Sequence, residues 1–127
     1  SKYWLAGVDV PEDDCPKVRI EESSGGSDEA HGVKAGDNVF IDYKLFLPMI
    51  NAPDKFVEGG KRFHFQQSSG DVIKGFEQGV AGMREGEKRV LFVPWQLAYG
   101  KRGSKPDIPP EADLIFHITL LSIDKSM

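Results

Sequence analysis

The clearest pattern along the chain is an alternation of apolar and polar side chains that begins at Val39. The apolar members, at every second position, are Val39, Ile41, Tyr43, Leu45 and Leu47. A period of two residues places such side chains on one face of a β-strand, so the pattern predicts a strand with a fully apolar face. Shorter alternations predict strands at 62–66 and 114–120, and a continuous apolar run predicts another at 90–93.

The period changes to three or four residues between Val72 and Met83, which predicts a helix. One stripe of this helix consists of Ile73, Phe76, Val80 and Met83. Asp71 precedes the stripe and is the predicted cap of the first turn. The helix contains three glycines. Its own propensity is therefore low, and we expect tertiary packing to hold it in place.

Several strands around one short helix, without a repeated strand–helix–strand order, predict an α+β domain in which an antiparallel sheet wraps around the helix. A loop at 95–113 separates the last two predicted strands. A loop of that length without regular structure is usually functional in a compact domain. We therefore expect this loop to contribute to the functional site.

The composition is that of a single soluble domain: 127 residues, 39% of them hydrophobic, with a net charge of −4. A chain of this length buries enough surface to fold without metal or disulfides. The acidity is uneven, because residues 1–37 contain nine acidic and four basic residues whereas the remainder contains eleven and twelve. The polar stretch 21–38, rich in Ser and Gly, predicts an exposed connection. Before it, Val18 and Ile20 alternate with polar residues as on a strand with one face in water.

Several kinds of function are disfavoured by what the sequence lacks. The near-neutral main part has only short basic clusters, which argues against nucleic acid as a partner. No apolar segment is long enough to span a membrane, and residues 1–10 do not have the pattern of a signal peptide. We therefore expect a cytoplasmic or nuclear protein without membrane contact. The three histidines lie far apart and Cys15 stands alone, so we expect neither a metal site nor a covalent nucleophile.

Three motifs, in order along the chain, narrow the function further. They are the run 71–80 (DVIKGFEQGV), the tetrapeptide 97–100 (LAYG) and the tripeptide 108–110 (IPP). Together with the strand segments 41–43 and 114–116, they make the chain resemble the FKBP-type peptidyl-prolyl isomerases, the macrolide-binding immunophilins. The resemblance covers 34–124. It divides the chain into an acidic N-terminal extension 1–33, which holds a short strand and the connection, an isomerase domain 34–124, and a tail 125–127.

The resemblance implies a half-barrel, in which a curled antiparallel sheet and the short helix enclose a shallow pocket that receives a proline ring. Phe76 would form the pocket floor, and Tyr99 and Ile108 would close one side from the long loop. The implied walls are Tyr43, Phe63, Val72, Ile73 and Phe116. The residues implied for catalysis are Tyr43, Asp54, Phe63, Ile73, Phe76, Tyr99 and Phe116. Among them, the Tyr99 hydroxyl and the Ile73 N–H would donate hydrogen bonds to substrate carbonyls.

Two departures from the family pattern bear on this site. The family usually has Phe directly before the pocket aspartate, whereas Pro53 precedes Asp54 here. The alternatives are that Asp54 keeps its role, that Phe56 moves into the place of the missing ring, or that Asp54 is a surface turn residue. The family's usual floor residue is Trp, so Phe76 implies that macrolides such as rapamycin bind with reduced affinity.

The function that the resemblance implies is cofactor-free cis-trans isomerisation of X-Pro bonds in peptides and protein loops, by a monomer. Rotation about a peptide bond has a barrier of about 18–20 kcal/mol. An apolar, water-poor pocket lowers that barrier if it binds the twisted amide better than either planar isomer, and no nucleophile is needed. The alternatives are a protein-binding module with weak or no isomerase activity, and a chaperone-like domain whose acidic N-terminal segment contacts clients.

Overall fold

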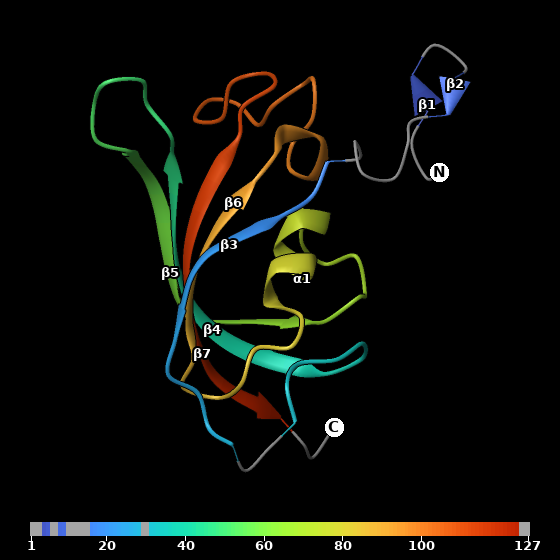
Figure 1. The fold of residues 1–127 in the computed structure, drawn as a ribbon, viewed down its shortest axis with the longest axis vertical. Coiled ribbons are helices and arrows are strands. Elements are labelled where there is room, and N and C mark those ends of the chain that lie inside the picture. Colours follow the sequence, from blue (N-terminus) through green and yellow to red (C-terminus); the bar gives the residue numbers. More distant parts are fainter. Residues whose placement is uncertain (1–3, 6–7, 10–15, 29–30, 125–127) are drawn as a thin grey trace.

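A computed structural model describes residues 4–5, 8–9, 16–28 and 31–124. In this part of the chain, a five-stranded antiparallel sheet with strand order β3-β6-β7-β4-β5 curls around a short helix, α1 (Figure 1). The elements are β3 Arg19–Ser24, β4 Asn38–Leu47, β5 Lys55–Gln66, α1 Lys74–Val80, β6 Lys88–Val93 and β7 Leu114–Asp124. Two short strands, β1 Trp4–Leu5 and β2 Val8–Asp9, pair with each other. The predicted α+β class, a curled sheet around one short helix, is confirmed.

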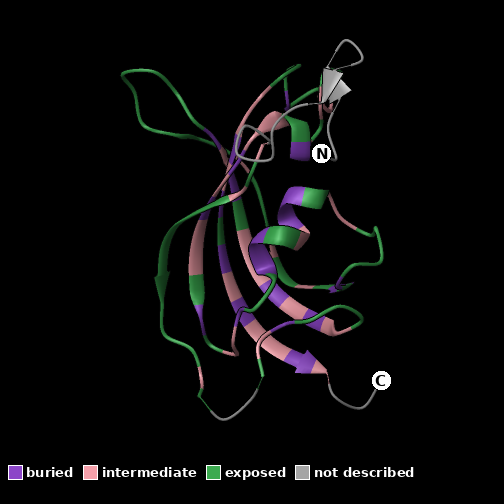
Figure 2. Ribbon diagram, turned by 45° about the vertical axis from the view of Figure 1, so that its right-hand side comes forward, coloured by how far each residue is buried: buried purple, intermediate pink, exposed green. Residues whose placement is uncertain are grey.

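The core lies between the concave face of the sheet and α1. The predicted apolar face of β4 is buried at Val39, Ile41, Leu45 and Leu47. Figure 2 shows the same alternation as purple bands along the strands, and the half of α1 nearest the sheet is also purple. Phe76 and Val80 of α1 are 4% and 0% exposed. The apolar face of the strand and the apolar stripe of the helix, both predicted from the sequence, therefore pack in one core.

Three strands are longer in the structure than the sequence pattern indicates. β3 runs into the segment predicted as an exposed connection, β5 begins at Lys55, and β7 continues to Asp124. All six side chains of β3 are exposed and Ile20 is its one apolar residue, so only the start of this strand carries the predicted alternation. Its place at the sheet edge is held by antiparallel pairing with β6.

The helix is shorter than the predicted 72–83 and its predicted cap is wrong. Ile73 occupies the N-cap position without a side-chain hydrogen bond, and the Asp71 carboxylate instead accepts from the Gln66 N–H at 3.3 Å. Gly75 and Gly79 explain why a weak helix former persists here. A Cβ atom at either position would collide with a side chain of β6, so the glycines let α1 lie directly on that strand. This agrees with the expectation that packing, rather than propensity, holds the helix.

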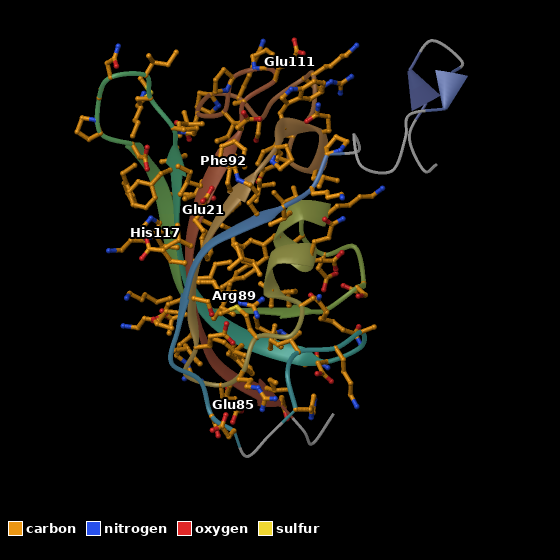
Figure 3. The ribbon with its side chains drawn as sticks, in the orientation of Figure 1. Glu21, Glu85, Arg89, Phe92, Glu111 and His117 are labelled. Atoms are coloured by element: carbon orange, nitrogen blue, oxygen red, sulfur yellow. The ribbon has the colours of Figure 1, made fainter. Side chains whose placement is uncertain are left out.

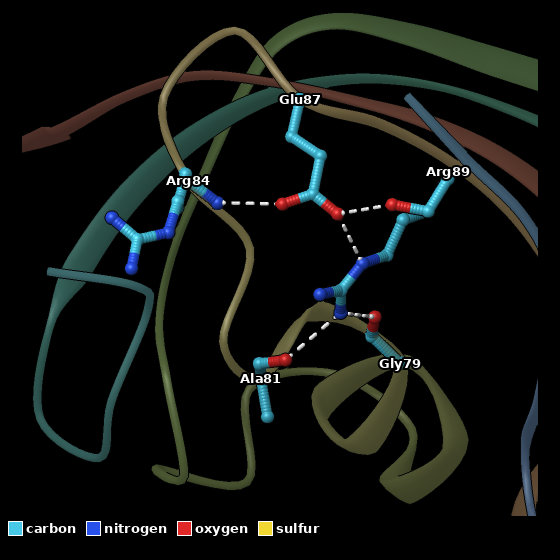
Figure 4. Close-up of polar contacts among 6 residues, drawn as sticks. Gly79, Ala81, Arg84, Glu87 and Arg89 are labelled. Atoms are coloured by element: carbon cyan, nitrogen blue, oxygen red, sulfur yellow. Dashed lines mark hydrogen bonds and ion pairs between the residues drawn. The ribbon is translucent and has the colours of Figure 1, made fainter. Parts of the chain in front are cut away.

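The C-terminal end of α1 is fixed by a buried polar group that we call the Glu87–Arg89 clamp (Figure 4). The Arg89 guanidinium donates to the carbonyls of Gly79 and Ala81 at 3.0 and 2.9 Å, and its Nε donates to Glu87 Oε2 at 2.6 Å. The other Glu87 oxygen accepts from the Arg84 N–H at 2.9 Å. Burial acts to raise the pKa of Glu87, but these hydrogen bonds and the Arg89 charge outweigh it and hold the pKa below its ordinary value of 4.5. The clamp therefore contains an ionised, fully hydrogen-bonded carboxylate.

Within the described residues, no helix has the length and apolarity that crossing a lipid bilayer requires. In the same part of the chain, no three His, Cys, Asp or Glu side chains gather so as to hold a metal ion.

Candidate active site

A pocket of about 460 Å³ opens between the start of α1 and the concave face of the sheet. Its lining comes from β4, β5, β7, the segment that leads into α1, α1 itself and the loop before β7. The lining residues are Tyr43, Leu45, Glu58, Phe63, Gly70, Asp71, Val72, Ile73, Phe76, Tyr99 and Phe116. Segments that are far apart in the sequence therefore build one apolar hollow.

Aromatic rings meet edge to face around Phe76, in the first turn of α1. Its ring centroid lies 5.0 Å from that of Phe116, 5.5 Å from Phe65 and 6.0 Å from Tyr43. Tyr43 in turn meets Phe63 at 5.6 Å. Such edge-to-face contacts add to the energy of burial and fix the orientation of each ring. The result is a rigid apolar floor and walls.

A glycine shapes one wall of the pocket. Gly60 in β5 pairs with Tyr43 in β4, and a Cβ atom at Gly60 would lie 2.6 Å from a ring carbon of Tyr43. The tyrosine ring therefore lies close to the backbone of β5, and a larger residue than glycine at this position would displace it.

The pocket has few polar groups, and these lie at its mouth. The Tyr43 hydroxyl donates to Glu58 Oε1 at 3.5 Å. Burial, followed by the charge of Glu58, raises the pKa of both Tyr43 and Tyr99 above the ordinary 10.0, so both hydroxyls stay protonated at neutral pH. The Ile73 N–H, at the start of α1, has no backbone acceptor among the described residues. The Tyr99 hydroxyl and the Ile73 N–H can donate hydrogen bonds to a bound carbonyl.

The loop at 95–113 is ordered rather than structureless. The Asp113 carboxylate accepts from the Trp95 N–H at 2.9 Å, so this hydrogen bond joins the two ends of the loop. Between them lie a 3-10 turn, Trp95–Leu97, and a pair of backbone hydrogen bonds between Ser104 and Ile108. The loop thereby holds Tyr99 at the pocket, with 36% of its surface exposed.

Comparison with known proteins shows the family of this chain. Residues 29–121 match the model of the family described as FKBP-type peptidyl-prolyl cis-trans isomerase. This chain belongs to that family. The predicted isomerase function is thereby confirmed at the level of the FKBP family, whose members are named for it.

Individual relatives agree with this assignment. FK506-binding protein 2 of Yarrowia lipolytica is 41% identical over 122 residues, which cover 94% of this chain and 85% of that protein. Peptidyl-prolyl cis-trans isomerase FKBP2 of Mus musculus is 46% identical over 92 residues, 72% of this chain and 66% of that protein. FK506-binding protein 4 of Rhizopus delemar is 45% identical over 95 residues, but these make up 25% of its length. The chain thus spans from a quarter to most of the FKBP proteins that it matches.

Seven of the nine site residues predicted from the sequence line the FKBP pocket. They are Tyr43, Phe63, Val72, Ile73, Phe76, Tyr99 and Phe116. Ile108 is not among the lining residues and is instead 5% exposed within the hydrophobic core. Asp54 is exposed in the turn between β4 and β5, outside the pocket lining.

Phe56, the alternative to Asp54, also lies elsewhere. It meets Phe46 at 5.6 Å and is 56% exposed. Phe56 borders a second hollow of about 630 Å³ over outward-facing positions of the sheet, such as Lys44 and His117. That hollow is larger than the aromatic pocket, but it shares only Tyr43 with the group of rings around Phe76, and most of its lining residues are polar or charged, so we assign the active site to the smaller one.

Sequence reasoning missed Leu45, Glu58, Gly70 and Asp71 in the pocket lining. Leu45 could have been found, because it shares the inward face of β4 with Tyr43. Glu58 directly precedes a Gly-Gly pair, in a part of β5 that the alternation does not mark. Its place becomes visible only through its pairing opposite Leu45.

Proposed function

We propose that the aromatic pocket binds the proline ring of X-Pro segments in peptides and proteins and accelerates cis-trans isomerisation of the preceding peptide bond. The observation that supports this most directly is the set of edge-to-face rings around Phe76, which leaves an apolar hollow of about 460 Å³ in an FKBP-family chain. The proposal applies to this domain, whatever further segments its longer relatives carry.

The chemistry needs only binding. Resonance keeps the peptide bond planar and charge-separated, and water stabilises that planar form. In the proposed cycle the proline ring rests on Phe76, while the carbonyl before it enters a hollow with few polar groups. The twisted amide has lost its resonance dipole and suffers least from this environment, so the pocket binds it more tightly than either planar isomer.

Two donors would keep the substrate in register while its amide turns. The Tyr99 hydroxyl, which remains protonated at neutral pH, and the free Ile73 N–H each offer one hydrogen bond to a substrate carbonyl. Each such bond contributes about 0.5–1.5 kcal/mol. Removing the hydroxyl with Tyr99→Phe should therefore lower kcat/KM by about two- to tenfold without removing the pocket.

The test is the rate of cis-trans exchange of a short Ala-Leu-Pro-Phe peptide, measured by NMR exchange spectroscopy with and without the protein. We expect a clear acceleration, a reduced one with Tyr99→Phe, and no change with His117→Ala, whose exposed side chain borders the outer hollow. An exchange rate equal to that of the free peptide would refute the proposal. Loss of activity in the His117 variant would indicate that the active site lies on the other face of the sheet.

We further propose that macrolides such as rapamycin bind the same pocket with reduced affinity, because Phe76 offers less ring surface than the larger indole usual in this family. Trp95 stands at the base of the loop that carries Tyr99, so its fluorescence reports binding. A titration should show weaker binding for the native chain than for Phe76→Trp. Equal or weaker binding by the variant would contradict the role given to the floor.

We also propose that the chain is a monomer. The exposed edge strand β3 carries Glu21 and Glu22, and charges on an edge discourage pairing with a second sheet. Sedimentation equilibrium at micromolar concentration should return the mass of one chain, 14.1 kDa, and a doubled mass would overturn this expectation.

A further inference from the structure

Glu58 lies on the pocket face of the sheet because of strand register. It pairs directly with Leu45 of β4, and directly paired residues of an antiparallel sheet project to the same side. Leu45 is 2% exposed and lines the pocket, so Glu58 is directed toward the same hollow. Its contact with the Tyr43 hydroxyl at 3.5 Å agrees with this direction.

The pocket lining carries charge of one sign only. Of its eleven residues, Glu58 and Asp71 are acidic and none is basic. The ion pairs found among the described residues involve other carboxylates, at Glu21, Asp37, Asp42 and Glu87. Asp71 is held by the Gln66 N–H and Glu58 by the Tyr43 hydroxyl, both of which are neutral donors. The two charges at the pocket mouth are therefore not neutralised by a cation of the described chain.

The nearest basic residues along the chain do not enter the pocket. Lys44, Arg62 and Lys74 each adjoin a lining residue in the sequence. Lys101 and Arg102 follow Tyr99 by two and three residues. All five are exposed and outside the lining. The raised pKa of both pocket tyrosines, to which Glu58 contributes, agrees with a negative field across the pocket.

We propose that Glu58, assisted by Asp71, is a specificity-determining residue that favours substrates with a lysine or arginine next to the proline. This inference rests on the proposed isomerase function and adds the substrate class. Glu58 is exposed at the pocket mouth, so it acts on the flanking side chain and leaves the twisting amide to the aromatic floor. Because the pair with a substrate cation is partly solvated, the preference is modest, about 1.5- to 5-fold in kcat/KM.

The experiment compares peptides that differ only beside the proline. Lysine, its neutral counterpart norleucine, and glutamate are placed in turn immediately before and immediately after the proline, and kcat/KM is measured by NMR exchange. We expect the lysine peptide to exceed the norleucine peptide by about 1.5- to 5-fold at one position at least, and the glutamate peptide to fall below it. Raising the salt concentration to about 1 M should reduce these ratios toward one.

Two variants separate charge from structure. Glu58→Gln keeps a side-chain oxygen that can accept from the Tyr43 hydroxyl but removes the charge, so the ratio of the lysine rate to the norleucine rate should fall toward one, whatever the absolute rates. Asp107→Asn is the matched control, because it also removes one negative charge, from an exposed position outside the pocket lining. It should leave the preference intact.

The possible outcomes distinguish the two proposals. If norleucine peptides are isomerised but lysine gives no advantage, the inference about Glu58 fails and the isomerase proposal stands. An equal loss of the preference in Glu58→Gln and Asp107→Asn would also overturn it. If no peptide is isomerised, the proposed function fails, and the same lysine-to-norleucine ratio measured as dissociation constants decides the inference about Glu58.

Discussion

The two ends of α1 are built on opposite physical principles. At its start, Ile73 occupies the N-cap position without a side-chain cap, and Phe76 packs into a group of aromatic rings. At its end, the Glu87–Arg89 clamp satisfies the carbonyls of Gly79 and Ala81 with charged hydrogen bonds. The apolar end has a pocket beside it, whereas the polar end is tied directly to β6.

The two ends of this seven-residue helix therefore have different roles: the first borders the pocket and the second anchors the helix. The charged residues of the pocket lining, Glu58 and Asp71, bond to Tyr43 and Gln66 and do not anchor the helix. The Glu87–Arg89 clamp anchors the helix at Ala81, one turn and a half beyond Phe76. In Figure 3, Arg89 and Glu85 lie well separated from the loop that contains Glu111, which is the loop that carries Tyr99. Changes at the two ends should therefore separate activity from stability.

The largest effect is expected from Phe76→Ala at the pocket end. Removing a ring that is 4% exposed should cost about 3–5 kcal/mol of unfolding free energy and more than tenfold in kcat/KM. Urea denaturation and NMR exchange, the latter at a temperature where the variant is folded, measure the two losses. Phe92→Ala is the control, because Phe92 lies on the outer face beneath Arg19. Full activity in folded Phe76→Ala would contradict the assignment of the pocket floor.

Arg89→Met tests the clamp end. It leaves Glu87 buried without its guanidinium partner, which should cost about 3 kcal/mol of unfolding free energy. The activity per folded molecule should stay close to native, because Arg89 does not line the pocket. Adding Glu87→Gln to Arg89→Met should recover part of the stability. A variant of native stability but without activity would show that the two ends are not separable.

Low pH should have a smaller effect on stability, and this effect should arise at the clamp end of the helix. The pKa of Glu87 is lower in the folded protein than its ordinary 4.5, so its stabilisation is complete above about pH 4.5 and is lost as the pH falls through the folded value. Glu87→Gln should therefore make the decline in unfolding free energy below pH 4.5 shallower. Asp37, whose pKa is also lowered, remains in both proteins. Parallel curves for the variant and the native protein would contradict the clamp's ionisation.

The smallest effect is expected from Asp54→Asn, which tests how far the pocket end extends. Asp54 is exposed in the β4–β5 turn and outside the lining, so its substitution should change kcat/KM by less than about twofold. Exchange rates on the Ala-Leu-Pro-Phe peptide decide the point. A loss of tenfold or more would return Asp54 to the role that the family resemblance implies.

Hydrophobic periodicity predicted the parts of the molecule whose burial is one-sided. A strand or helix with one apolar face must bury that face against another element. The strand face with Val39 and Ile41 and the helix stripe with Phe76 and Val80 could therefore be expected to pack in one core. The family motifs then placed most of the pocket walls. β3 left little such signal, because Ile20 is its one apolar residue and all its side chains are exposed. Backbone pairing with β6 and contacts such as Ser23 with Glu87 hold it in the sheet.

The polar parts of the molecule were beyond sequence reasoning for a different reason. Glu87 and Arg89 look like surface charges in the sequence, and only their mutual contact and the helix carbonyls explain their burial. The direction of the Glu58 side chain depends on the pairing of β4 with β5, whose register shifts near Tyr43 and near Phe46. Such contacts arise from three-dimensional placement, which no local pattern encodes.

The strand order has a consequence for how this protein comes into being. β7 is the last of the described strands in sequence order, yet it lies between β6 and β4 in the middle of the sheet. During synthesis, the half of the sheet that holds β3 and β6 cannot join the half that holds β4 and β5 until β7, through Asp124, has left the ribosome. Pairings between such distant segments also make folding slow. The sheet, and with it the pocket on its concave face, therefore cannot be completed until β7 has been synthesised.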